Sequence, residues 1–380
     1  MLALKFPTSQ QSWTALEFFA GIGLARAGLE EQNITTKWAN DYDINKQQMY
    51  CAQWGKNEFV LADVHKVAAV DVPDADVAWS SSPCTDLSLA GNRRGLHEGR
   101  ESSAFFGFTR VLREMGQRKP PVMVLENVVG LASSRNGEDF RAAIIELNSL
   151  GYAVDTVVLD ARRFLPQSRR RLFIVGSVQP VDGGDHDTVA RPDSVAWIHQ
   201  DKSLNTFRVP LAKVPDIVDG GFTQLLENID YDDLRWWDSD RTSRFLHSMS
   251  DSQRARLDAL VAESFISART AYRRTRDGKP RWEMHSEDIA GCLRTARGGS
   301  SKQAVVVMGN NSFRIRWMTG LEYARLMGAG WFNLEGLRES QIHYGFGDAV
   351  VVPAVSWVAQ NMIVPLLEAN YNKRHVEHVV

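Results

Sequence analysis

The sequence predicts an α/β fold built on an open, mostly parallel sheet, together with a smaller second region. Short apolar strands alternate with helix-forming segments over the first half of the chain, as in parallel βαβ units. Several of these strands end directly in polar residues. A strongly polarised segment, residues 181–302, then separates the first apolar region from a second one at 313–358.

The bulk composition sets few limits on function. The 380 residues carry a formal net charge of −2 with a pI of about 6.5, so the totals indicate neither a nucleic-acid binder nor a membrane protein. The longest apolar runs, such as 305–308 and 350–353, are far shorter than the roughly 20 residues that cross a bilayer. The amino terminus lacks a signal-peptide pattern. Three widely spaced cysteines argue against a disulfide framework or a cysteine zinc site, so we expect a reducing, cytoplasmic location.

The first predicted unit is a strand at Ala15–Phe19, a glycine turn at Gly21-Ile22-Gly23, and a helix over 24–31. Such a unit lets a ligand approach bare backbone near a helix amino terminus. On its own, the turn is compatible with a dinucleotide, with a sulfonium cofactor, or with no ligand at all.

The next two predicted strands, 36–39 and 58–61, each end close to a carboxylate, Asp41 and Asp63. Asp41 follows the glycine turn at about the distance where a Rossmann fold places an acid for ribose hydroxyls. Either aspartate can instead cap the helix that follows it, and both roles can hold at once.

The predicted strand Ala75–Trp79 leads to Pro83-Cys84. Proline cannot continue a hydrogen-bonded ladder, so Cys84 should lie at the carboxyl end of the strand, where open α/β sheets bind ligands. The polar stretch 91–100 has little to bury and is predicted to be a surface lid. A helix is then predicted over 103–118, ending before Pro120-Pro121.

An acid and an amide, Glu126 and Asn127, close the apolar strand that begins at Val122. A carboxylate at the tip of a buried strand requires a partner. After a helix at 138–150 and a strand at 152–159, the run Gln167–Gly176 leads arginines into another apolar strand. These arginines are either a buried counter-charge or phosphate contact, or an exposed basic strand end.

The polarised segment has an acidic half followed by a basic half. Residues 181–240 have a net charge of −8, and residues 241–302 have a net charge of +6. The basic half mixes arginines with aromatic residues around Tyr272 and Trp282 and ends in a glycine-rich basic loop. This composition suits a nucleic-acid groove, although a solvated basic face has the same signature.

Two features are predicted near the carboxyl end. Thr319–Met327 should form a helix with Thr319 near its cap. Tyr344–Val350 is predicted as a glycine turn that opens the last, mostly apolar helix, with a loose polar tail after about Tyr371.

Together these stretches resemble the cytosine-C5 DNA methyltransferase family over nearly the whole chain. Six motifs in the family's order carry the resemblance: Phe19–Gly23, Pro83-Cys84 with Ser88 and Ala90-Gly91, Glu126–Val128, Gln167 with Arg169 and Arg171, Thr319–Met327 with Arg316 upstream, and Gly347–Pro353. The resemblance implies a Rossmann-like class I methyltransferase fold with a mostly parallel seven-stranded sheet. It implies a catalytic, S-adenosylmethionine-binding domain at 1–181, a target-recognition domain at 182–311, and a return to the catalytic domain at 312–380.

The implied reaction moves a methyl group from S-adenosylmethionine to carbon 5 of a flipped-out cytosine in a specific duplex DNA sequence, leaving S-adenosylhomocysteine. By resemblance, the Cys84 thiolate attacks carbon 6, because carbon 5 is a poor nucleophile until the ring is activated. Glu126 holds or protonates ring nitrogen 3, while Arg169 and Arg171 steady the base and the surroundings of the nucleophile. The resemblance implies no metal.

The resemblance also assigns binding residues. The cofactor-binding positions are Phe19, Gly21, Ile22, Gly23, Asp41, Tyr42, Asp63, Val64, Pro83, Asp348, Ala349 and Val350. The DNA-binding positions are Ser88, Arg93, Arg94, Gln167, Arg273, Arg274, Arg294, Arg297 and Lys302.

Two departures from the family pattern stand out. Ser82 replaces the first proline of Pro-Pro-Cys, and Asp348 stands where asparagine is usual, which affects one polar contact to the carboxylate end of the cofactor. The expected partner is double-stranded DNA, with a restriction endonuclease acting separately if the chain is a restriction–modification methylase rather than an orphan. We expect a monomer in a prokaryotic cytoplasm, without membrane contact. The alternatives are a tRNA cytosine-C5 methyltransferase and a catalytically silent DNA-binding regulator.

Overall fold

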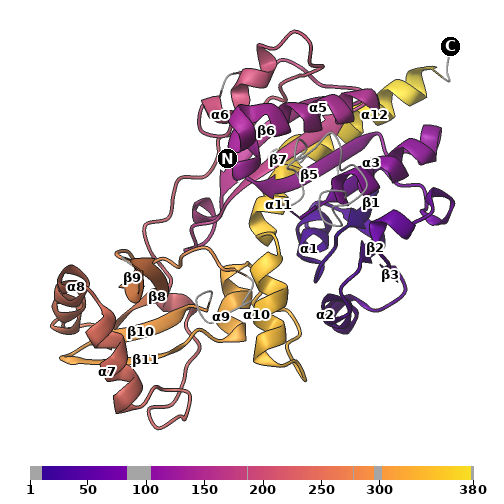
Figure 1. The fold of residues 1–380 in the computed structure, drawn as a ribbon. Helices are drawn as coiled ribbons and strands as arrows, with labels where there is room; N and C mark the ends of the chain where they lie inside the picture. The colour runs from indigo at the N-terminus through magenta and orange to yellow at the C-terminus, as the bar shows by residue number, and fades with distance from the viewer. Residues whose placement is uncertain (1–10, 84–103, 186, 277, 295–301, 378–380) are drawn as a thin grey trace, which may run out of the picture.

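The computed structural model describes residues 11–83, 104–185, 187–276, 278–294 and 302–377. It contains a seven-stranded sheet of order β3-β2-β1-β4-β5-β7-β6 and a four-stranded sheet of order β11-β10-β8-β9. Figure 1 shows the smaller sheet standing apart from the larger one, with its own helices α7 and α8. The predicted α/β fold with a mostly parallel seven-stranded sheet is confirmed.

All strands of the larger sheet except β7 run in the same direction. The strands are β1 (Trp13–Phe18), β2 (Ile34–Asp41), β3 (Phe59–Leu61), β4 (Val77–Ser80), β5 (Val122–Val128), β6 (Ala153–Asp160) and β7 (Arg170–Ser177). Strand β7 is antiparallel to both β5 and β6. It therefore begins at the edge of the sheet where β4 and β5 end.

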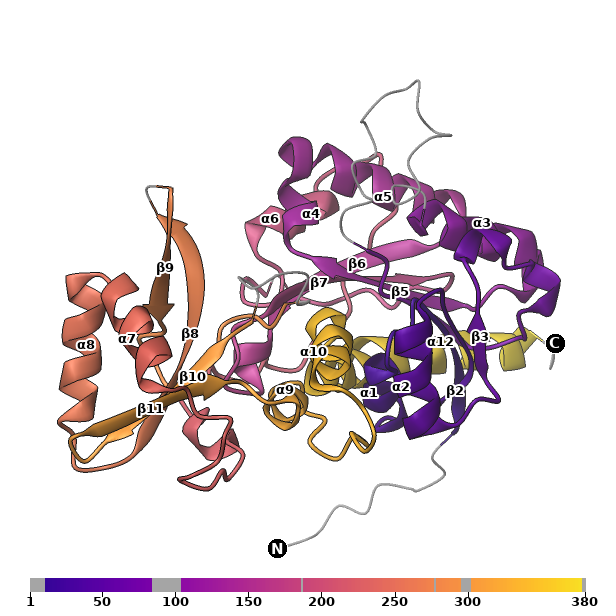
Figure 2. The same ribbon diagram turned by 60° about the horizontal axis from the view of Figure 1, so that its bottom comes forward.

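Helices cover both faces of this sheet, as Figure 2 shows. On one face α3 (Ala104–Met115), α4 (Gly130–Ser133), α5 (Glu138–Ser149) and α6 (Asp193–Ala196) bury an apolar cluster that includes Phe105, Phe140 and Val195. On the other face lie α1 (Leu24–Glu30), α9 (Gly320–Leu326), α10 (Glu339–Asp348), α11 (Val352–Val358) and α12 (Val364–Glu377), with a π-helical turn at 359–363 between the last two. Helix α2 (Ile44–Trp54) packs beside β3 and α10.

Two predictions near the carboxyl end are wrong. Tyr344–Asp348 are not a turn, because they form the end of helix α10. A Cβ atom on Gly345 would lie 2.7 Å from Met49 Sδ, so this glycine lets two segments pack closely and does not reverse the chain. The residues after Tyr371 are not a loose tail, because α12 continues to Glu377.

The first part of the polarised segment packs against the larger sheet. Arg191 is buried and donates both to Asp155 on β6 and to the Val209 carbonyl. Val209 and Phe222 belong to the same apolar cluster as α11. The acidic half of the segment therefore crosses the larger domain before the chain reaches the smaller sheet.

The smaller sheet is held by an aromatic core. Its strands are β8 (Ser267–Arg276), β9 (Lys279–Met284), β10 (Ala304–Gly309) and β11 (Ser312–Trp317), flanked by α7 (Ser239–Ser248) and α8 (Asp251–Val261). Trp237 lies 5.1 Å from Trp317 and 5.7 Å from Trp282, ring centre to ring centre. The expected boundary at residue 311 falls in the turn between β10 and β11.

A buried ion pair joins the two sheets. Arg316 on β11 and Glu322 on α9 are both almost fully buried, with Arg316 Nη1 2.8 Å from Glu322 Oε2. Glu322 also accepts from the Thr319 amide at 2.9 Å and completes a capping box with the Thr319 hydroxyl. The predicted cap at Thr319 is confirmed.

The helical run Glu339–Lys373 is long and apolar enough to cross a membrane, but 78% of its most apolar window is buried inside the protein. Val355, Val358 and Leu366 of this run belong to the core beneath the large sheet. Its apolar character is therefore explained by packing.

We predict that Glu322→Gln lowers the free energy of unfolding by roughly 3–5 kcal/mol, because it leaves the Arg316 guanidinium buried without its counter-charge. Urea unfolding followed by circular dichroism measures this loss. Glu335→Gln, at an exposed position, is the matched control and should change the value by less than about 0.5 kcal/mol. Equal stability of the two variants would contradict the prediction.

Candidate functional site

The glycine turn after β1 has a left-handed backbone at three positions. Phe19, Gly21 and Gly23 have φ values of 57°, 58° and 81°. A Cβ atom on Gly23 would lie 2.3 Å from Trp54 Nε1, and that indole donates to the Ile22 carbonyl at 3.1 Å. A Cβ atom on Gly21 would meet open space within 4 Å. The turn therefore presents bare backbone that is held firmly from behind.

Asp41 supports this turn from the end of β2. Its Oδ2 accepts from the Gly21 amide at 2.9 Å and its Oδ1 from the Asp43 amide at 3.0 Å. Burial raises the pKa of Asp41, against the lowering effects of Lys46 and of these two amides. Next to it, Tyr42 is 65% exposed. An open aromatic ring beside a buried carboxylate suits a nucleoside.

Asp63 has the capping role that the sequence left open. Its Oδ1 accepts from the His65 amide at 3.0 Å and caps the short 3₁₀ turn that begins at Val64. Val64 itself is buried, and the side chain of Asp63 is exposed. The cap leaves Oδ2 available to a ligand.

Asp348 closes the same region from α10. Its Oδ2 lies 3.1 Å from Lys46 Nζ on α2. The residues after it, Ala349 and Val350, turn the chain toward α11. The glycine turn, the end of β2 and the end of α10 therefore meet in one place.

The second half of the site lies at the ends of β4 and β5. These strands pair with Ser80 opposite Leu125, so the chain after Ser80 runs beside Glu126. The Asn127 amide nitrogen donates to the Ser82 carbonyl at 3.1 Å. This bond fixes the turn up to Pro83. Cys84, Ser88, Arg93, Arg94 and the predicted lid at 91–100 lie outside the described residues.

Glu126 is buried and paired with Arg171. The Arg171 Nε atom lies 3.0 Å from Glu126 Oε1, across the antiparallel β5–β7 pair. The Glu126 residue is 7% exposed. A carboxyl group and a guanidinium thus meet at the sheet edge, beside the turn that leads to Cys84.

Arg169 is 2% exposed and binds backbone. It donates to the carbonyls of Leu293 at 2.8 Å, Ala349 at 2.6 Å and Gly347 at 3.2 Å. Burial lowers the pKa of Arg169 to about 10, helped by Arg171 and opposed by Cys292 and Glu126. Its guanidinium therefore holds two segments, one at Leu293 and one at Gly347–Ala349, at the edge of the site.

Gln167, predicted to contact DNA, has no exposed surface. Its side-chain amide donates to the Leu326 carbonyl at 2.6 Å and accepts from the Leu293 amide at 3.4 Å. Any effect of this residue on DNA must pass through the segments that it joins.

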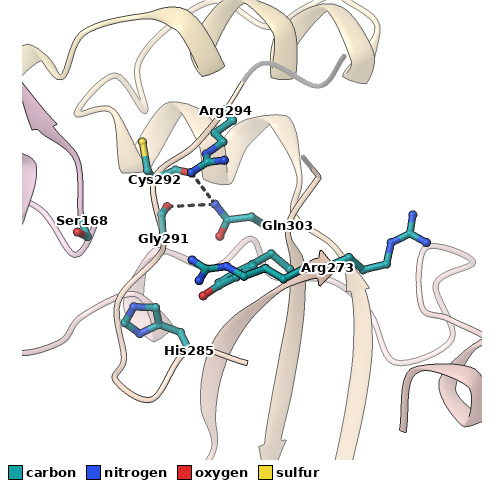
Figure 3. Close-up of a pocket in the computed structure, with 9 residues that line it drawn as sticks. Ser168, Arg273, His285, Gly291, Cys292, Arg294 and Gln303 are labelled. Atoms are coloured by element: carbon teal, nitrogen blue, oxygen red, sulfur yellow. Dashed lines mark hydrogen bonds between the residues drawn. The ribbon is translucent and has the colours of Figure 1, made fainter. Parts of the chain in front are cut away.

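A cleft of about 310 Å³ opens between the larger sheet and the basic part of the smaller one. Its lining residues are Ser168, Tyr272, Arg273, Arg274, His285, Gly291, Cys292, Arg294 and Gln303. Figure 3 shows the Gln303 amide bridging the Gly291 and Cys292 carbonyls along one wall. The structure therefore brings the predicted Arg273, Arg274 and Arg294 together at one cleft.

The remaining predicted DNA contacts are placed differently. Lys302 is half-buried just before β10, and Arg297 lies outside the described residues. Sequence reasoning missed Ser168, His285 and Cys292 as lining residues of the cleft. The position of Ser168 inside the Gln-x-Arg-x-Arg run was the one available signal, because His285 and Cys292 reach the cleft only through the fold.

Within the described ranges, no group of three or more His, Cys, Asp or Glu side chains is arranged to hold a metal ion. The polar side chains of the site are instead carboxylates, arginines and amides.

Comparisons with known proteins agree with this geometry. The chain is 38% identical over 161 residues to the type II methyltransferase M.Bsp6I of a Bacillus species, and 30% identical over 161 residues to M.HhaI of Haemophilus parahaemolyticus. These matches take in 42% of the chain and about half of each relative, 50% and 47% respectively.

Two solved structures share the fold over most of their length. The crystal structure of the S. pombe Dnmt2 methyltransferase superimposes with a TM-score of 0.63 at 18% identity, covering 93% of this chain and 99% of that one. The Entamoeba histolytica methyltransferase EhMeth gives a TM-score of 0.59 at 13% identity, covering 94% of this chain and 99% of that one. Residues 13–364 match the profile of the C-5 cytosine-specific DNA methylase family, and the chain therefore belongs to that family.

Proposed function

We propose that this protein is a DNA cytosine-C5 methyltransferase that uses Cys84 as a covalent nucleophile. One observation carries the proposal. The Asn127 amide holds the Ser82 carbonyl at 3.1 Å, and this brings Pro83, the residue before Cys84, close to the buried Glu126–Arg171 pair. A nucleophile and a carboxyl group at one sheet edge are the groups that ring activation of cytosine requires.

In this proposal each side chain has a distinct task. The Cys84 thiolate adds to carbon 6 of the cytosine ring. Arg171 occupies Glu126 Oε1 and fixes the carboxyl group, which leaves Oε2 to hold or protonate ring nitrogen 3 as electrons move into the ring. Arg169 acts as a positioning residue, because it binds backbone carbonyls on either side of the pocket.

The residues around the glycine turn fit S-adenosylmethionine, which supplies the methyl group when bound. The turn offers open backbone at Gly21, Asp41 suits the ribose hydroxyls, and Asp63 suits the adenine amino group. Phe19, Gly21 and Gly23 face the methionine end in this assignment, and Ile22 belongs to the same turn. Tyr42, Val64, Pro83 and the stretch Asp348–Val350 complete the walls.

The cleft lined by Arg273, Arg274 and Arg294 suits duplex DNA, because clustered guanidinium groups bind phosphates and read guanine edges. The target base must leave the stack to reach the Cys84 turn, at a cost of a few kcal/mol. Since the relatives are named type II methyltransferases, we place the chain in a restriction–modification system or as an orphan methylase. We further propose a monomer in a prokaryotic cytoplasm, with any restriction endonuclease acting separately.

We predict that, with S-adenosylmethionine present, duplex DNA containing 5-fluorocytosine at the target position forms a stable covalent adduct with the wild-type protein. Fluorine replaces the carbon 5 proton whose loss after methyl transfer would release the cysteine. Cys84→Ala should form none. Denaturing electrophoresis and mass spectrometry detect the adduct. Cys51→Ala, which removes another free cysteine on α2, is the matched control and should form the adduct normally. An adduct that survives in Cys84→Ala would remove Cys84 from the mechanism.

We predict that Glu126→Gln slows methyl transfer by about 10²–10⁴-fold, because it removes an acid–base group without changing the shape of the side chain. Binding of S-adenosylhomocysteine should stay within about twofold of wild type, since Glu126 lies on the base side of the site. Single-turnover transfer and calorimetric titration measure the two quantities. Equal losses in both would indicate a folding defect, and Glu138→Gln, exposed at the start of α5, is the control for overall charge.

The substrate is tested by supplying tritiated S-adenosylmethionine with either duplex DNA or tRNA. We expect label in DNA and only background in tRNA, because the cleft belongs to a separate basic sheet beside the catalytic one. Label in tRNA alone would favour the RNA methyltransferase. Binding of DNA with no label in either substrate would favour the silent regulator.

A further inference from the structure

Lys46 lies where α2, α10 and the glycine turn meet. Its ammonium is 3.1 Å from Asp348 Oδ2 and 5.5 Å from the centre of the Tyr344 ring. The Lys46 side chain is only 16% exposed. A lysine held this closely at a ligand-binding edge needs an explanation, because lysine is among the residues that are least often buried.

The contacts around Lys46 lead directly to the glycine turn. Asp41, which attracts Lys46 electrostatically, accepts from the Gly21 amide at 2.9 Å. The Tyr344 hydroxyl donates to Asp43 Oδ2 at 2.7 Å. Gly345 packs against Ile22 of the turn itself, where its Cβ would lie 2.9 Å from Ile22 Cγ2. Lys46 therefore belongs to the wall of the cofactor pocket.

The charge of this wall depends on Lys46. Three carboxylates, Asp41, Asp43 and Asp348, lie around the one lysine. Although burial disfavours the charged ammonium, Asp41 and Asp348 outweigh it and raise the pKa of Lys46 to about 12. Lys46 is thus cationic throughout the working range of pH. Without it, the negative charges of Asp41, Asp43 and Asp348 would repel a ligand carboxylate.

We propose that Lys46 is a positioning residue of the cofactor pocket, whose ammonium neutralises Asp348 and Asp41 so that the pocket accepts the carboxylate end of S-adenosylmethionine. This inference rests on the proposed function, since it assumes that the glycine-turn pocket binds that cofactor. It adds a residue that none of the six motifs contains.

A purely structural role for the ion pair makes a different prediction. If Lys46 and Asp348 only tie α2 to α10, removing either partner should lower thermal stability and cofactor affinity alike. Removing both should not restore either quantity. Charge compensation instead requires that loss of the lysine harms binding and that additional loss of the aspartate, which restores the charge balance, recovers part of the lost affinity.

The experiment measures binding of S-adenosylhomocysteine by calorimetry, with the melting temperature of each free protein recorded beside it. We expect Lys46→Met to bind at least about 10-fold more weakly than wild type, because like charges that face each other across a binding site cost affinity. The double variant Lys46→Met/Asp348→Asn should recover at least about threefold of the affinity that Lys46→Met loses, because it restores the charge balance. Lys56→Met, which removes one charge at an exposed position just after α2, is the matched control and should bind as wild type does.

A second ligand tests whether Lys46 acts on the carboxylate end of the cofactor. 5′-Methylthioadenosine lacks both the carboxylate and the amine, so Lys46→Met should bind it with wild-type affinity. Lys46→Arg keeps the charge and should bind S-adenosylhomocysteine normally, which keeps the test decisive if Lys46→Met does not fold. Wild-type affinity in Lys46→Met, no recovery in the double variant, or a parallel loss for 5′-methylthioadenosine would overturn the inference. Failure of the wild type to bind S-adenosylhomocysteine would instead overturn the proposed function, and the inference with it.

Discussion

The reversed direction of β7 is the constraint on which the site depends. In a wholly parallel sheet, only the carboxyl ends of strands would meet at the edge where the chain reaches Pro83. Because β7 runs the other way, its amino end reaches that edge and brings Arg169 and Arg171 with it. Arg171 then meets Glu126, and Arg169 meets the carbonyls of Leu293 and Ala349. Arginine suits this place, since its planar fork can donate to several carbonyls at once while a lysine ammonium cannot match that geometry.

The sequence predicted most of the elements and the partners that lie close along the chain. The spacing of Arg169, Arg170 and Arg171 even distinguishes their roles, because strand side chains alternate: Arg169 is buried, Arg170 exposed and Arg171 half-buried. The two alternatives considered for this run therefore both apply: Arg169 and Arg171 make buried contacts, while Arg170 is exposed. The contacts of Arg169 and Gln167 could not be predicted, since their partners lie more than 120 residues away in the chain. The error at Tyr344–Val350 has a related cause, because only the packed neighbours of Gly345 show that it permits close helix contact.

The charge asymmetry of the polarised segment corresponds to two locations. In the acidic half, Asp201 pairs with Arg141 on α5 of the larger domain, and Asp233 pairs with Arg235 two residues further along the chain. In the basic half, Arg273 and Arg274 remain beside the cleft, although Arg274 also has Glu283 at 3.6 Å. Net charge along the chain therefore indicated a basic surface correctly, but it did not show that the acidic stretch mainly packs against the catalytic sheet.

A buried glutamate next to the glycine turn makes the stability of the fold depend on pH. Glu17 on β1 lies directly beneath it, is 1% exposed, and accepts from the Arg26 amide at 3.2 Å. Burial raises the pKa of Glu17 to about 8, even though the Arg26 amide and guanidinium act against the shift. In the unfolded chain this glutamate titrates near pH 4.5. Its contribution to the stability of the folded protein is therefore largest below pH 4.5. The contribution is lost as the pH rises towards 8. The carboxyl group of Glu17 thus makes this edge of the sheet sensitive to alkaline pH. The Arg26 amide holds Glu17 from α1, and the Arg26 guanidinium donates to Tyr50 on α2.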